Sequence, residues 1–99
     1  MFENINFYND EIIFNDLYKD TILFLEEMEI KEKDLLFVKY PSGLVLDVDW
    51  HNSIFFVSII QNDDWDNQIV KRRCKSLNEL KIALKDCIFI IKKMSLKRK

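Results

Sequence analysis

The amino-acid sequence predicts one α+β domain, a four-stranded antiparallel meander flanked by an N-terminal and a C-terminal helix. Three observations predict it: helix-type spacing of apolar residues at both ends of the chain, four strand-like runs between them, and connections too short for parallel crossovers. The chain has 99 residues, so we expect residues 1–99 to form a single domain. Apolar residues make up 48% of the chain, which excludes a disordered protein and suffices for one core.

The first predicted element is a helix over residues 10–30. Residues 9–11 (Asn-Asp-Glu) are typical of a helix start, because such side chains cap free backbone N–H groups and complement the helix dipole. Asn15 and Asp16 mark a point at which this helix could break. The apolar residues at helical spacing, which we expect to face the core, are Ile13, Leu17, Phe24 and Met28, joined by Phe14, Tyr18, Thr21 and Leu25.

Four strand-like runs follow, over residues 35–40, 44–50, 53–61 and 68–74. A tight turn with Pro41 and Gly43, the only proline and glycine, separates the first two runs. In the second run Asp47 and Asp49 alternate with apolar residues, so both should project from one face of the sheet. The third run is apolar on both faces, which is typical of a strand in the middle of a sheet.

The C-terminal helix is predicted over residues 76–94. Ser76 and Glu79 form a capping box, in which each side chain satisfies a free backbone donor at the helix start. If this helix and the N-terminal one pack on the same face of the sheet, an apolar set such as Ile54, Phe56 and Ile60 would be exposed on the other face. A patch of that kind normally marks a contact surface, which keeps a homodimer open as an alternative.

No motif of a catalytic site is present, and we expect no catalytic residue, bound metal or cofactor. The single glycine, Gly43, excludes glycine-rich phosphate-binding loops. His51 lies in an expected turn, and Cys74 and Cys87 lack the spacing of zinc ligands. The clustered aspartates could hold Mg²⁺ for phosphoester chemistry, but they are more often a solvated face and turn-forming residues.

The predicted location is the cytoplasm. The first ten residues lack a basic segment followed by a long apolar run, and the longest apolar runs are too short to span a bilayer. Two cysteines without a paired motif fit a reducing compartment. We therefore expect no membrane partner.

Charge is distributed unevenly along the chain. Residues 1–66 contain fifteen Asp and Glu against four Lys, a net charge of −11, whereas residues 67–99 contain two acids against eleven Lys and Arg, a net charge of +9. The two halves could simply neutralise each other in the fold. Alternatively the basic half could contact phosphates, as in a small nucleic-acid-binding regulatory protein. Strand alternation weakens that alternative, because it sends Lys71 and Arg73 to one face and Arg72 to the other.

The acidic half favours inhibition of a basic protein. An acidic surface can cover the positive substrate groove of a nuclease, and an aromatic side chain within that surface can anchor the contact. Trp65 could equally cap the end of the sheet as part of the core. The residues that we expect to bind the partner are Asp47, Asp49, Asp63, Asp64, Trp65 and Asp66.

Four segments of the chain carry a family resemblance: residues 44–50 (LVLDVDW), residues 55–60 (FFVSII), the pair Asp64-Trp65, and the capped helix over residues 76–84. Together they resemble small immunity proteins of contact-dependent growth inhibition and related polymorphic-toxin systems, over roughly residues 35–92. The resemblance implies a bacterial protein that neutralises a cognate antibacterial toxin by covering its active site or substrate groove. The implied partner is the C-terminal toxin domain of a large exported protein, often a nuclease acting on tRNA or DNA.

Overall fold

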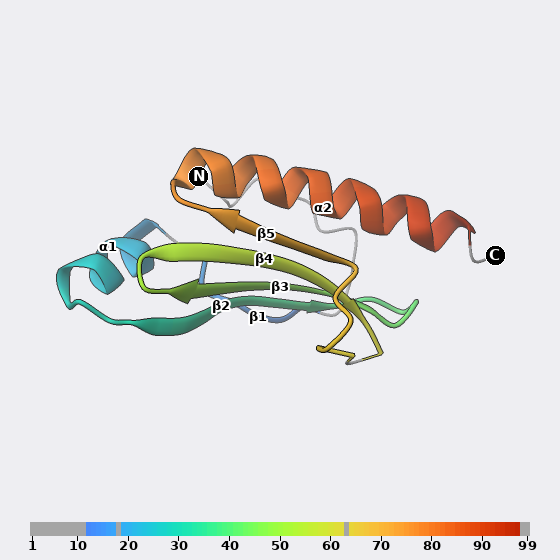
Figure 1. Ribbon diagram of the computed structural model, residues 1–99, viewed down its shortest axis with the longest axis horizontal. Helices are drawn as coiled ribbons and strands as arrows, with labels where there is room; N and C mark the ends of the chain where they lie inside the picture. Colours follow the sequence, from blue (N-terminus) through green and yellow to red (C-terminus); the bar gives the residue numbers. More distant parts are fainter. Residues whose placement is uncertain (1–11, 18, 63, 98–99) are drawn as a thin grey trace.

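The computed structural model describes residues 12–17, 19–62 and 64–97 (Figure 1). Its elements are, in chain order, β1 (Ile12–Asn15), α1 (Lys19–Glu27), β2 (Glu32–Lys39), β3 (Leu44–His51), β4 (Ile54–Gln61), β5 (Val70–Cys74) and α2 (Leu77–Lys97). The strands form one sheet in the order β1-β2-β3-β4-β5, and every neighbouring pair is antiparallel. The predicted α+β class is confirmed, since one helix precedes and one follows the four-stranded meander β2 to β5. As predicted, β4 lies inside the sheet, between β3 and β5.

The N-terminal element differs from the predicted helix over residues 10–30. Residues 12–15 form the edge strand β1, and the helix is limited to Lys19–Glu27. The predicted helix start at residues 9–11 lies outside the described residues. Asn15 Oδ1 accepts a hydrogen bond from Leu17 N at 3.0 Å, and Asp16 N donates to Leu35 O at 2.7 Å. These two bonds turn the backbone away from a helical path and tie it to β2, so strand and helix separate at the point where the sequence allowed a break.

The residues buried in the α1 region match the prediction only in part. Leu17 and Leu25 are buried, as predicted. Phe24 and Met28, also expected in the core, are 52% and 62% exposed, whereas Ile22, which was not expected there, is buried. The helix starts only at Lys19, so the packing of this short segment on the sheet sets which of its faces is buried. Ile22 and Leu25 are three residues apart and therefore lie on the same face of the helix.

Two tight turns connect β2, β3 and β4. Gly43 N donates to Tyr40 O at 2.9 Å, and Gly43 has a φ of 91°, a left-handed conformation that glycine adopts without strain. A Cβ at Gly43 would lie 2.5 Å from Asn62 Oδ1, so the Asn62 side chain would have to move to admit one. At the other end of β3, Asn52 and Ser53 have φ values of 49° and 68°, as in a two-residue hairpin turn.

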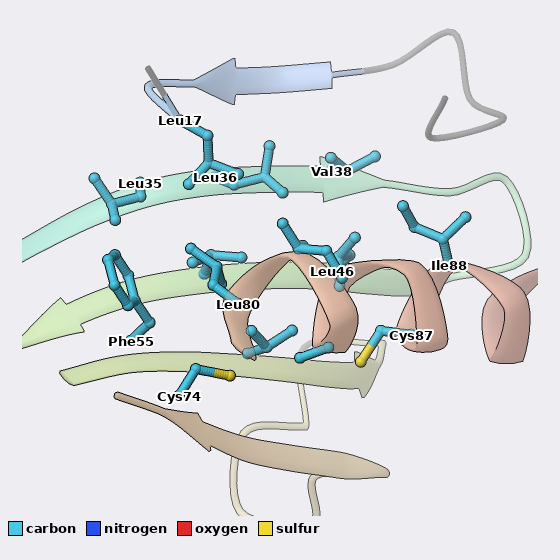
Figure 2. Close-up of a cluster of buried hydrophobic side chains, with 14 of the residues drawn as sticks. Leu17, Leu35, Leu36, Val38, Leu46, Phe55, Cys74, Leu80, Cys87 and Ile88 are labelled. Atoms are coloured by element: carbon cyan, nitrogen blue, oxygen red, sulfur yellow. The ribbon is translucent and has the colours of Figure 1, made fainter. Parts of the chain in front are cut away.

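Helix α2 covers one face of the sheet, and Figure 2 shows its apolar side chains directed toward those of the strands. The shared core includes Leu80, Leu84, Cys87 and Ile88 of α2 with Leu36, Val38, Leu46, Val48 and Val57 of β2, β3 and β4. Ile22 and Leu25 of α1 belong to the same core, so both helices pack on one face. No helix of the described chain covers the opposite face.

The opposite face is less apolar than expected for a sheet with both helices on one side. Ile54 and Phe56 are half-buried there, but Ile60 and its cross-strand neighbour Val45 are buried. The predicted exposed set of Ile54, Phe56 and Ile60 is therefore reduced to the first two. The remainder of this face, toward the His51 end of β3, carries polar and charged residues.

Helix α2 begins one residue after the predicted capping residue Ser76. Glu79 N donates to Ser76 Oγ at 3.2 Å, and Glu79 Oε2 accepts from Lys75 N at 3.0 Å and from Ser76 Oγ at 3.2 Å. The capping box is confirmed, although the glutamate satisfies the N–H of Lys75.

We expect Ser76→Ala to lower the free energy of unfolding by about 1 kcal/mol, because it removes the acceptor for the third helical N–H group. Urea denaturation followed by circular dichroism measures this loss. Asn78→Ala, an exposed change within the same helical turn, is the control and should stay within about 0.5 kcal/mol of the parent. Equal stabilities of Ser76→Ala and the parent would contradict the role of the cap.

Candidate functional site

Two of the predicted site residues lie together on the sheet face opposite α2. Asp47 and Asp49 alternate with the core residues of β3, and the register places Asp47 opposite Ser58 and Asp49 opposite Phe56. The prediction that both aspartates project from one face is confirmed. Asp47 is only 5% exposed, whereas Asp49 is half-buried. Asp47 therefore lies beneath the surface, and Asp49 is the member of the pair that reaches it.

A β-bulge in β2 adds a third carboxylate, that of Asp34. Leu36 pairs with Val48, so a regular ladder would place Leu35 opposite Asp49, but the residue opposite Asp49 is Asp34. The extra residue leaves Leu35 in the core, where it is buried, and shifts Asp34 to the carboxylate face. We call Asp34, Asp47 and Asp49 the carboxylate cluster.

A cavity of about 350 Å³ lies beside the carboxylate cluster. Its lining comes from β2 (Glu32, Lys33, Asp34), β3 (Asp49, Trp50, His51), β4 (Phe56, Ser58), β5 (Lys71) and the β4–β5 loop (Trp65, Gln68). The loop is fastened to the sheet by the bond from Ser58 Oγ to Gln68 Oε1 at 3.4 Å and by that from Ile69 N to Ile59 O at 2.8 Å. These contacts hold the loop so that Trp65, which is 45% exposed, forms part of the lining.

The environment of the carboxylate cluster raises the pKa of two of its members. Burial, followed by hydrogen bonding to and repulsion from Asp47 and Asp34, raises the pKa of Asp49 to about 8. Burial also raises the pKa of Asp47, although a hydrogen bond from Asp49 opposes that rise. Since two ionised carboxylates cannot hydrogen-bond, the contact between Asp49 and Asp47 requires a proton, which the raised pKa places on Asp49 at neutral pH. Apart from this contact, Asp47 Oδ2 and Asp49 Oδ1 are buried and meet no donor of the described chain.

The basic side chains nearest the carboxylate cluster contact other groups. His51 Nδ1 lies 3.0 Å from Glu32 Oε1, and Lys33 Nζ lies 3.4 Å from Asp16 Oδ2. Within the described part of the chain, no ion pair involves a member of the cluster. Lys71 Nζ, which also belongs to the cavity lining, lies 5.6 Å from the centroid of the Phe56 ring. The charge of the cluster is therefore not neutralised by an ion pair within the described residues.

The structure brings only some of the predicted partner-binding residues together. Asp49 and Trp65 line the same cavity, and Asp47 lies next to Asp49. Asp64 and Asp66 are exposed and do not line it; Asp64 accepts hydrogen bonds from Asn67 Nδ2 at 3.2 and 3.4 Å, the turn-forming role considered as the alternative. Asp63 lies outside the described residues.

Sequence reasoning did not place Phe56, Lys71 or Asp34 beside the two predicted aspartates. Phe56 and Lys71 could have been found from strand alternation in an antiparallel meander. Phe56 pairs with Asp49, and Lys71 pairs with Ser58, which itself pairs with Asp47. Asp34 could not have been found this way, because regular pairing would have sent it to the opposite face. Its place depends on the bulge.

The basic segment of β5 is divided between the two faces, as predicted. Arg72 reaches toward α2, where its Nη1 lies 2.8 Å from Asp86 Oδ2. Lys71 and Arg73 lie on the other face, and both approach the Phe56 ring, the Arg73 Cζ at 6.0 Å from its centroid. The three cations therefore do not form one continuous surface.

Among residues 12–17, 19–62 and 64–97, no three His, Cys, Asp or Glu side chains are grouped so as to hold a metal ion. Nor does any helix among them combine the length and the apolar character needed to cross a membrane. Cys74 and Cys87 are both buried and free, and burial raises the pKa of the Cys87 thiol to about 11.

Comparison with protein-family models, curated proteins and solved structures gives no significant match.

Proposed function

We propose that this protein is a cytoplasmic inhibitor that binds a basic toxin domain and neutralises it, in the manner of an immunity protein. The observation that carries the proposal is the cavity on the sheet face that no described helix covers, where carboxylates and aromatic rings line one space together with Lys33 and Lys71. A positively charged partner, such as a nuclease with a phosphate-binding groove, complements this surface.

Two further features support a binding role for this face. Asp34 and Asp49 keep no ion-pair partner within the described residues, so a cation from another molecule would improve their electrostatic environment. Trp65 is 45% exposed beside them and offers a large, rigid contact surface of the type that dominates protein interfaces. An acidic rim with an aromatic anchor provides both fast association and slow dissociation.

Co-expression tests this function directly. The parent protein, produced in bacteria together with the toxin domain encoded by the neighbouring gene, should restore growth and inhibit the toxin in a purified assay. The double variant Asp34→Asn, Asp49→Asn should weaken binding at least about tenfold, corresponding to about 1.4 kcal/mol or more. The matched control Asp64→Asn, Asp66→Asn makes the same two chemical changes at exposed positions outside the cavity, and it should protect like the parent. Absence of protection by the parent would refute the proposed function.

Nucleic-acid binding through the basic C-terminal half is the alternative function. It receives less support, because Arg72 pairs with Asp86 while Lys71 and Arg73 lie over Phe56 on the other face. A gel-shift titration at two salt concentrations distinguishes the two functions. Strongly salt-dependent binding of RNA or DNA would favour the alternative.

A further inference from the structure

We propose that the cavity is a receptor for a single guanidinium group, the side chain of one arginine that the basic partner inserts between the carboxylate cluster and the aromatic residues Trp65 and Phe56. This inference rests on the proposed function, because it names the chemical group by which the partner is recognised. It can nevertheless be tested without the partner.

The carboxylates that line the cavity are the first argument. Asp34 and Asp49 both line it, and neither forms an ion pair with a cation of the described chain. A guanidinium provides up to five N–H donors in one plane. Asp34 and Asp49, facing each other across β2 and β3, offer carboxylates from two strands to such a planar group.

The aromatic lining is the second argument. Trp65 and Phe56 both line the cavity that contains Asp49. A guanidinium stacks on aromatic faces and is more weakly hydrated than an ammonium group, so this combination of rings and carboxylates favours arginine over lysine. The chain itself demonstrates that a Phe56 face accepts cations, since Lys71 and Arg73 lie 5.6 and 6.0 Å from its centroid.

The size of the cavity is the third argument. Its volume of about 350 Å³ is close to the lower end of the range for small-molecule sites, about 300–1,000 Å³. This space suits one long side chain. We therefore expect the remainder of the interface to lie on the surrounding surface.

The experiment uses the full chain and three small probes: N-acetyl-arginine amide, N-acetyl-lysine amide and the uncharged isostere N-acetyl-citrulline amide. Binding is followed by two-dimensional NMR, with the Trp65 indole N–H and the Phe56 and Asp49 amides as reporters. The arginine probe should bind with a dissociation constant on the order of 1 mM, and the lysine probe at least about threefold more weakly. The citrulline probe should show no saturable binding. Equal shifts with citrulline and arginine, or no binding of arginine, would overturn the inference.

Substitutions in the cavity lining should change the affinity for the arginine probe in opposite directions. Asp34→Asn with Asp49→Asn should weaken binding of the arginine probe at least about tenfold, whereas the matched pair Asp64→Asn with Asp66→Asn should change it less than about twofold. Lys71→Gln should strengthen binding, because it removes a like charge from the lining. A general loss of folding cannot produce that gain. Weaker binding in Lys71→Gln would contradict the assignment of the site.

The pH dependence of binding gives a second test, because binding of the arginine probe should release the proton held by Asp49. A cation beside Asp49 favours the ionised carboxylate, so binding of the arginine probe should tighten between pH 6 and pH 9. The other charged groups around Asp49 are Asp47, Asp34, Glu32, Lys33, His51 and Lys71. His51→Gln should keep the pH dependence, and Asp49→Asn should remove most of it. A pH dependence that follows His51 would contradict this assignment.

The two proposals fail separately. If the parent protects against the toxin but the arginine probe does not bind, the arginine receptor is wrong and the inhibitor function stands. If the arginine probe binds as described but the parent gives no protection, the cavity chemistry stands and the inhibitor function is wrong.

Discussion

Leu84→Ala should lower the free energy of unfolding by about 2–5 kcal/mol, the largest loss that we expect from a single substitution in this protein. Leu84 is fully buried in the layer where α2 meets the sheet, next to Leu80 and Cys87 in the same core. Truncation removes apolar contacts and leaves a space that a closely packed core refills only in part. Because small domains unfold with only about 5–15 kcal/mol, this loss is a large share of the total. Urea denaturation followed by tryptophan fluorescence and circular dichroism measures it.

Ile82→Ala is the matched control for this prediction. Ile82 lies two residues before Leu84 on the same helix but is 57% exposed. Its truncation should change the free energy of unfolding by no more than about 0.5 kcal/mol. Comparable losses in the two variants would mean that α2 does not pack on the sheet through the face that contains Leu84.

The second large effect is a fall in stability as the pH rises. Asp49 has a pKa of about 8 in the folded protein, above the value of about 3.9 for an unperturbed aspartate. Between these two values the folded state holds a proton that the unfolded state has released, so raising the pH favours unfolding. The stabilisation is fully present below the unfolded pKa and is lost as the pH rises through the folded pKa. Because Asp49 is only half-buried, we expect a loss of about 2–3 kcal/mol between pH 5 and pH 9, less than the full linkage value.

Asp49→Asn isolates this effect. The amide is neutral at every pH used, can donate to Asp47, and should make the variant more stable than the parent at pH 9, with a flatter dependence on pH. Asp66→Asn, at an exposed position outside the cavity, should keep the slope of the parent. Parallel slopes for the parent and Asp49→Asn between pH 5 and pH 9 would show that Asp49 titrates as an ordinary surface carboxylate.

The same arrangement connects stability with the proposed function. A carboxylate cluster on a sheet face is unfavourable in the isolated protein, because burial and mutual repulsion both disfavour its ionised form. Apolar residues at these positions would fold with less electrostatic strain. A basic partner that contacts the cluster would relieve that strain on binding, and such locally unfavourable groups are typical of functional sites.

The central and C-terminal parts of the fold follow from local patterns in the amino-acid sequence. Strand alternation predicted the core face of β3 and placed Asp47 and Asp49 together on the other face. The two-sided apolar run predicted β4 as an internal strand, and the capping box at Ser76 and Glu79 marked the start of α2. These features depend on residues close together in the chain, whose periodicity and capping chemistry act locally.

The N-terminal region and the composition of the candidate site depend on contacts between distant parts of the chain. The segment before α1 forms the edge strand β1 because its backbone pairs with β2, whose paired residues lie 21 to 26 positions further along the chain and are not revealed by local spacing. The bulge exchanged Leu35 and Asp34 between the two faces, since burying the leucine under the helices outweighs a regular ladder. Trp65 reached the cavity because the loop folds back on Ser58 and Ile59. Each of these outcomes depends on packing between residues distant in the chain, where the gain from burial exceeds the weaker local preferences.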